Sequence, residues 1–206
     1  MRKYHAYNLL PESSRNTSED IILKKLNDYS GEFLPDLKPE DFSHDTLAEL
    51  LRVYSQLYIA IDGFWYLAVM ERSGNEEALA CDLLAWEKVC KYEMAKVTKH
   101  LNIQGNDVIA LMKAMQVLPW FHKIKCEVNI KNSNNATMTV THCPTLEALE
   151  KEGSGRESEI CRTVELKIFE GYASFFNPGI ETKPLKLPPR GSKDEVCCQW
   201  EFKLEE

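Results

Sequence analysis

A single carboxylate, Asp62, lies inside the apolar and aromatic stretch AIDGFWYLAV, residues 60–69. Burying an unpaired carboxylate is costly, so Asp62 must be hydrated, paired, protonated or bound to something. One interpretation makes it a structural anchor, at a point where Gly63 lets two helices approach closely. The other makes it the polar floor of a ligand pocket, where loss of hydration raises its pKa and suits it to acid–base chemistry or ligand binding.

Other acidic and aromatic residues are candidates for the same site. Glu71 is nine positions after Asp62, and at about 100° per residue the two lie on opposite sides of one helix, so they do not pair. Asp82, one turn before Trp86 in the next expected helix, is better placed as a companion for Asp62. Aromatic side chains can wall an apolar pocket or simply form core. We predict a ligand site with Asp62, Trp65, Glu71, Asp82, Trp86 and Trp200.

The seven cysteines include no Cys-x-x-Cys pair, which in a reducing compartment indicates thiols or metal ligands rather than disulfides. Cys143, Cys161 and Cys198 lie near the ends of expected elements and could converge at one end of a sheet. Such a set would suit zinc or iron, although the gaps of 18 and 37 residues lack a short chelating spacing. For Cys81, Cys90 and Cys126 we expect core packing.

Charge and composition exclude several classes of function. The formal net charge is −7 and the basic residues are dispersed, which argues against a nucleic-acid partner. The apolar run at 59–70 is shorter than the roughly 20 residues of a membrane span, and the N-terminus lacks the apolar stretch of a signal peptide. We therefore expect a cytoplasmic protein with no membrane partner. Gly-x-Ser-x-Gly, phosphate-loop and dinucleotide motifs are absent, so no motif names an enzyme class.

The first part of the chain is expected to be helical. Residues 1–44 are polar and punctuated by proline, with one short helix near residues 20–29, and are interpreted as an arm or cap. From Asp45 to Ser73 the apolar spacing predicts a long core helix whose buried face is Leu47, Leu50, Tyr54, Leu57, Ile61, Phe64 and Ala68. A second helix from residue 75, antiparallel to the first, has one apolar face formed by Leu79, Leu83, Trp86, Cys90, Met94, Val97 and Leu101. A third helix, 107–118, ends before a proline.

Beyond residue 123 the apolar period changes from helical to alternating. Residues 124–131 and 137–142 predict an antiparallel hairpin, with Met138, Val140 and His142 buried. His142 and Cys143 point to opposite faces, so a core histidine is favoured over a fourth metal ligand. A helix at 159–176 and a last strand with Cys198, Trp200, Phe202 and Leu204 on one face complete the chain. The prediction is one α+β domain over 45–206, with a helical half (45–122) packed on a small antiparallel sheet with a late helix (123–206).

Several motifs occur in a characteristic order: Asp62-Gly63-Phe64-Trp65, Glu71, Asp82, Trp86, Pro119-Trp120, Cys143-Pro144, Cys161, Asn177-Pro178, Pro188-Pro189 and Cys198-Gln199-Trp200-Glu201-Phe202. From about residue 50 onward this series resembles a family of uncharacterised prokaryotic cytosolic proteins, a domain of unknown function. Members carry Asp-Pro at Asn177-Pro178 and two further cysteines before the Pro-Pro pair, so the resemblance carries over only Cys143, Cys161 and Cys198. The late helix and closing strand are more distantly similar to vinyl-reductase-like ligand-binding domains and aminothiazoline-carboxylate hydrolase-like proteins.

These patterns favour a module that binds or senses a small ligand or a metal in a pocket between the helical hairpin and the sheet. The alternative is a hydrolase of a small heterocyclic or amide substrate that uses Asp62 or Glu71 as its acid–base group. A third interpretation is a homodimeric scaffold that associates through helix faces.

Overall fold

The computed structural model describes residues 25–205, which fall into two compact units, one within residues 1–46 and one within residues 47–206. The first unit contains a short 3₁₀ helix, η1 (Pro39–Asp41), and an isolated bridge between Leu26 and Phe42. The helix expected at 20–29 lies partly outside the described residues. Its described part, 25–29, is not helical, because the Leu26 backbone bonds to Asp41 and Ser43 instead of to its own neighbours.

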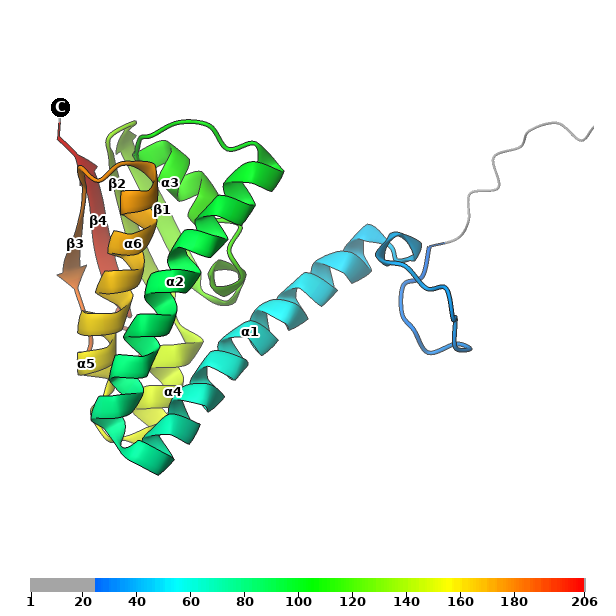
Figure 1. Cartoon of the computed structure of the whole chain (residues 1–206), viewed down its shortest axis with the longest axis horizontal. Coiled ribbons are helices and arrows are strands. Elements are labelled where there is room, and N and C mark those ends of the chain that lie inside the picture. The colour runs from blue at the N-terminus through cyan, green and yellow to red at the C-terminus, as the bar shows by residue number, and fades with distance from the viewer. Residues whose placement is uncertain (1–24, 206) are drawn as a thin grey trace, which may run out of the picture. The chain divides into compact units, whose positions relative to one another are not determined.

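Three helices open the second unit, as the sequence predicts: α1 (His44–Ser73), α2 (Asn75–Leu101) and α3 (Val108–Met115) (Figure 1). Gly74 separates the first two at φ +90°, a conformation that side chains other than glycine rarely adopt. Asp107 caps α3 by accepting a hydrogen bond from the Ala110 N–H at 2.8 Å. The short helix η2 (Pro119–Lys123) follows and carries Trp120.

The sheet is antiparallel throughout, in the order β1-β2-β4-β3. Its strands are β1 (Lys125–Asn132), β2 (Asn135–His142), β3 (Ile180–Lys186) and β4 (Cys198–Leu204). The predicted hairpin and final strand are confirmed, and Met138 of β2 lies opposite Trp200 of β4. Strand β3 was not predicted. It contains Pro184, which a strand tolerates at the edge of a sheet, where an N–H is not needed on the open side.

A helix that the sequence analysis did not predict, α4 (Pro144–Glu152), begins directly after Cys143. The Cys143 sulfur accepts a hydrogen bond from the Leu146 N–H at 3.4 Å, and Pro144 occupies the first helical position. Cysteine is not among the usual N-caps, which explains why this start was missed. The late helix predicted at 159–176 is present as α5 (Glu157–Ile160), a π-helical turn (Cys161–Glu165) and α6 (Leu166–Phe176).

The core lies between one face of the sheet and the layer formed by α2, α3 and α6 (Figure 1). Helices α2 and α6 lie close together at Gly171, where an added Cβ would be 3.1 Å from the Cys90 Cβ. Trp86, Cys90 and Met94 on the predicted face of α2 are buried, whereas Leu101 at its end is exposed. The α+β class is therefore confirmed.

The apolar face of α1 differs from the prediction. The residues that face other parts of the second unit include Ser55, Tyr58, Asp62 and Tyr66. The face expected in the core is largely exposed in the part of the chain that the structure describes. Leu47 and Leu50 of that face are half-buried, and Tyr54, Leu57, Ile61, Phe64 and Ala68 are exposed. The four large exposed side chains of this set and their exposed neighbours Leu51 and Trp65 form what we call the outer face of α1, which comprises Leu51, Tyr54, Leu57, Ile61, Phe64 and Trp65. Helical spacing identifies side chains that gain from apolar contact, but α1 is apolar on more than one side, so the spacing misidentified the face that is buried.

None of the helices within residues 25–205 is long and apolar enough to cross a membrane.

Candidate functional site

A cavity of about 120 Å³ lies inside the second unit, between the helices and the sheet. Its walls come from elements remote in sequence: α1, α2, η2, β2, the start of α4, the π-helical turn, α6, the loop after β3, and β4. The wall is mostly apolar, with Tyr58, Ile59, Trp86, Trp120, Ile124, Met138, Val140, Pro144, Leu146, Ile160, Val164, Ile168, Phe169, Pro188 and Trp200.

Most of the residues that the sequence analysis selected line this one cavity: Asp62, Asp82, Trp86, Cys143, Cys161, Cys198 and Trp200. Trp65 and Glu71 do not. Trp65 belongs to the outer face of α1 and is 69% exposed, and Glu71 is exposed near the end of the same helix. Both are therefore absent from the site that the structure assembles.

Three carboxyl groups gather at the cavity from three different elements: Asp62 on α1, Asp82 on α2 and Glu165 at the end of the π-helical turn. Burial raises the pKa of Asp82 to about 7, and repulsion by Asp62 adds to the rise. Burial likewise raises the pKa of Glu165 to about 7, with further contributions from both aspartates. Asp62 lies at the solvent-exposed rim and its pKa rises less, to about 6. The Trp86 indole N–H is close to both aspartates. Because it favours their ionised forms, it lowers the pKa of Asp62 and of Asp82 and offsets part of the rise.

Glu165 is the acidic residue that the sequence analysis missed. It follows Cys161 by four residues and precedes Phe169 by four, so all three share one helix face, and all three line the cavity. A carboxylate on an otherwise apolar helix face is the same signal that singled out Asp62, and it was available in the sequence. The π-helical turn was not foreseen either, and such turns occur frequently at functional sites.

The three predicted cysteines of the cavity, Cys143, Cys161 and Cys198, are neutral thiols. Burial raises the pKa of Cys143 and of Cys198 to about 12, and burial together with the nearby Glu165 raises that of Cys161 further. Metal binding and nucleophilic attack both use the thiolate, which these surroundings disfavour. In the described part of the chain, no group of three or more His, Cys, Asp or Glu side chains is placed to hold a metal ion. The geometry thus gives the predicted zinc or iron site no support.

A network of buried hydrogen bonds connects two cavity-lining side chains, Tyr58 and Trp120. Glu93, only 9% exposed, accepts hydrogen bonds from the hydroxyls of Tyr58 at 2.7 Å and Tyr172 at 2.6 Å. The Trp120 indole N–H donates to the Tyr172 hydroxyl at 3.2 Å. Because Tyr58 and Trp120 both line the cavity, the network holds two of its walls in place.

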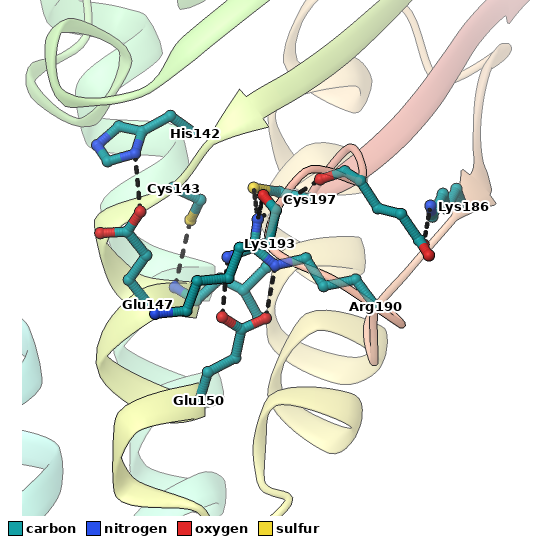
Figure 2. A network of polar contacts seen from close by, with 10 residues as sticks. His142, Cys143, Glu147, Glu150, Lys186, Arg190, Lys193 and Cys197 are labelled. Carbon is teal, nitrogen blue, oxygen red and sulfur yellow. Dashed lines mark hydrogen bonds and ion pairs between the residues drawn. The ribbon is translucent and has the colours of Figure 1, made fainter.

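The loop between β3 and β4 closes one end of the cavity with Pro188 and Cys197, and Arg190 anchors this loop (Figure 2). The Arg190 guanidinium donates two hydrogen bonds to the Glu150 carboxylate of α4, at 2.6 and 2.8 Å. It also donates to the Lys193 carbonyl at 3.1 Å and to the Cys197 sulfur at 3.5 Å. The Arg190 side chain is 4% exposed, so this ion pair is well shielded from water on the arginine side.

His142 lies beside this loop, and it is not the core histidine that was expected. Its Nδ1 is 2.9 Å from Glu147 Oε1, and 38% of its side chain is exposed (Figure 2). The backbone pattern of β2 points His142 toward the core side, but the strand ends there and α4 begins, so the ring reaches solvent.

Replacing Arg190 with alanine is expected to lower the free energy of unfolding by about 2 kcal/mol, because Glu150 loses its partner and the loop loses its anchor. Urea unfolding measures the change. Lys186→Ala is the matched control: the Lys186–Glu195 pair of the same loop region is 34% and 44% exposed, and its loss is expected to cost less than about 0.5 kcal/mol. Equal effects of the two variants would contradict the anchoring role.

Comparison with known proteins identifies the family of this chain but no individual relative. A family model described as a family of unknown function, DUF6125, matches residues 40–204. The chain belongs to this family. No curated protein and no solved structure matches it. The resemblance to an uncharacterised family is thus confirmed at that level, while the likeness to vinyl-reductase-like domains and aminothiazoline-carboxylate hydrolase-like proteins stays a prediction. Since DUF6125 carries no stated activity, function must be argued from the cavity.

Proposed function

We propose that this DUF6125 member is a binding module for a small organic cation, a molecule with an apolar ring and a protonated nitrogen. One observation carries the proposal: a single cavity combines an apolar, aromatic wall with three carboxyl groups on three separate elements. A small organic cation is a narrower class than the small ligand or metal predicted from the sequence, and its binding requires no metal ion.

The size and lining of the cavity support the apolar part of the ligand. Trp86, Trp120, Phe169 and Trp200 provide flat apolar surfaces around a space of about 120 Å³. A dry apolar cavity of roughly 150 Å³ accepts benzene. The cavity is slightly smaller, so one six-membered ring is the largest apolar group that it encloses, and a short polar substituent on that ring would extend out of the enclosed space to the open rim near Asp62.

The charges support the cationic part. The described residues that line the cavity include Asp62, Asp82 and Glu165 but no Lys, Arg or His. The three acids therefore repel one another, which contributes to the raised pKa values of Asp82 and Glu165. A ligand cation would supply the missing counter-charge, favour the ionised carboxylates and displace their protons. The Trp86 ring at the same end can add a cation–π contact.

Two further groups can refine recognition. Trp200 is buried in the wall, and its indole N–H has no hydrogen-bond partner among the described residues, although the weakly accepting Cys198 thiol is near. An acceptor atom on the ligand would satisfy this donor. The thiols of Cys143, Cys161 and Cys198 then act as polarizable, uncharged contacts.

Three probes with one ring and different charge test the proposal: benzylamine, benzyl alcohol and benzoate. At millimolar concentration and pH 8, we expect benzylamine to bind at least about tenfold more tightly than benzyl alcohol, since one charge-assisted contact is worth more than about 1.4 kcal/mol. Benzoate should not bind. Tryptophan fluorescence and ligand-observed NMR measure the affinities. Equal binding of all three probes, or preference for benzoate, would contradict a cation site.

The hydrolase alternative rests on the same carboxyl groups, because acids with a pKa near 6 or 7 suit general acid–base catalysis at neutral pH. Asp62 stays a candidate for that role, whereas Glu71 lies outside the cavity. Release of ammonia or benzoate from benzamide by the full chain, lost in Asp62→Asn, would favour this alternative over simple binding. A cytoplasmic location and the lack of a nucleic-acid partner stay predictions under both functions.

A further inference from the structure

The outer face of α1 is an exposed apolar surface on the second unit. Its six side chains, Leu51, Tyr54, Leu57, Ile61, Phe64 and Trp65, are each between 58% and 69% exposed. Three of the six are aromatic, with about 150–250 Å² of surface each, and with the three aliphatic side chains they leave roughly 600 Å² of apolar surface in water. This area is at the upper end of the range of about 300–600 Å² for the largest apolar patch on an ordinary monomer, and such a patch is often an interaction site.

The sequence of this face has the pattern of a helix that pairs with another helix. Within this face Tyr54, Leu57, Ile61 and Phe64 are spaced three, four and three residues apart, and Leu50 and Ala68 continue the same spacing on either side, which is the a/d pattern of a heptad repeat. Between Arg52 and Glu71 the one charged residue is Asp62, and Asp62 lines the cavity instead of the outer face. Burying the outer face therefore leaves no unpaired charge in the contact.

We propose that two copies of this chain associate through the outer faces of their α1 helices, around a twofold axis. A twofold contact requires one surface that is complementary to itself, and a heptad stripe without charges meets this requirement. A specific interface buries about 800 Å² per partner. The six side chains supply most of that area, and Val53 and Leu67 beside them, both 42% exposed, extend it.

This association is independent of the proposed ligand. Ile59 and Asp62 contribute to the cavity from the side of α1 away from Leu57, Ile61 and Phe64. Tyr58 lies at the border of the two sides, seven residues from both Leu51 and Trp65, and its hydroxyl is held by Glu93. Pairing centred on Ile61 therefore leaves the cavity lining intact. Loss of the dimer and loss of ligand binding can therefore be measured separately in the same samples.

The experiment measures the mass of the full chain by sedimentation and by light scattering. We expect the wild-type protein to have about twice the chain mass of 23.7 kDa. Ile61→Glu, near the middle of the face, should raise the dimer dissociation constant at least about a hundredfold, because two carboxylates would be buried against apolar surface. Leu84→Glu is the matched control: Leu84 is an exposed leucine of α2 outside the outer face, and its change should leave the dimer intact.

A mixture of Ile61→Glu and Ile61→Lys chains separates loss of the contact from loss of the fold. In a parallel pair of α1 helices, residue 61 of one chain faces residue 61 of the other, and in an antiparallel pair aligned at their centres the two lie close together. The opposite charges of the two variants then attract each other, so the mixed sample should regain the dimer at low salt. A wild-type chain that is monomeric at tens of micromolar overturns the proposal. A dimer that both Ile61 variants keep also overturns it, since the contact would then lie elsewhere.

Discussion

Replacing Glu165 with glutamine is expected to stabilise the unliganded protein at pH 8 by about 2 kcal/mol and to weaken benzylamine binding at least about tenfold. Burial and the two neighbouring aspartates raise the pKa of Glu165 from 4.5 to about 7. The folded state therefore holds the proton of Glu165 more tightly than the unfolded chain does. The Glu165 contribution to stability falls as the pH rises from about 4.5 to about 7, where the folded protein must ionise this group.

The pH profile of the variant tests this origin. Glutamine has no charge to bury, so the gain in stability of Glu165→Gln over wild type should be largest at pH 8 and smallest at pH 4.5. Urea unfolding at the two pH values gives both differences. The control is Glu170→Gln in α6, where Glu170 pairs with Lys167 and its side chain is 43% exposed, and its effect should stay within about 0.5 kcal/mol at either pH. A pH-independent gain for Glu165→Gln would contradict the raised pKa.

Glu165→Gln is thus expected to raise the stability of the protein and to lower its affinity for benzylamine. A purely structural acid would lower stability when it is removed. Functional sites typically contain groups that lower the stability of the fold and strengthen ligand binding, and Glu165 would be such a group. If Glu165→Gln gained stability without loss of benzylamine binding, the carboxyl cluster would be strained but would not be the cation site.

Replacing Phe169 with alanine is expected to cost 3–5 kcal/mol of stability, or roughly 10 °C in Tm. Phe169 is 4% exposed, and its ring centroid lies 4.9 Å from that of Trp200, 5.7 Å from that of Phe202 and 5.9 Å from that of Trp120. Its removal deletes the ring at the centre of this cluster and opens the cavity into the core. Thermal and urea unfolding measure the loss.

Phe175 in the same helix provides the control, because its side chain is 40% exposed. Phe175→Ala should cost only about 1–2 kcal/mol, since two-fifths of the residue is already in water and its removal opens no cavity in the core. Similar losses in the two variants would mean that the aromatic cluster around Phe169 is not the main source of stability in this part of the core.

Local pattern determined most of the elements. The apolar periods correctly located α1, α2, α3, the β1–β2 hairpin and β4. In α2, α3, β2 and β4 the period follows a regular stripe of buried residues, whereas in α1 it located the helix but not its buried face. The pattern failed for α4 and β3. Helix α4 begins at a cysteine cap, and β3 carries a proline that is acceptable only because the strand lies at the edge of the sheet. Both depend on surroundings that a local window does not contain.

For the candidate site, the sequence by itself determined which residue types were out of place: an acid in an apolar helix, and thiols at the ends of elements. That Asp62, Asp82 and the thiols of Cys143, Cys161 and Cys198 line one cavity was decided by the tertiary structure, which brings together α1, α2, the π-helical turn and β4. The same structure leaves Trp65 and Glu71 outside and adds Glu165. The physical reason is that burial and Coulomb repulsion depend on which groups are close in space, not on which are close in sequence. A carboxyl group therefore acquires its raised pKa only when the fold has brought its neighbours together.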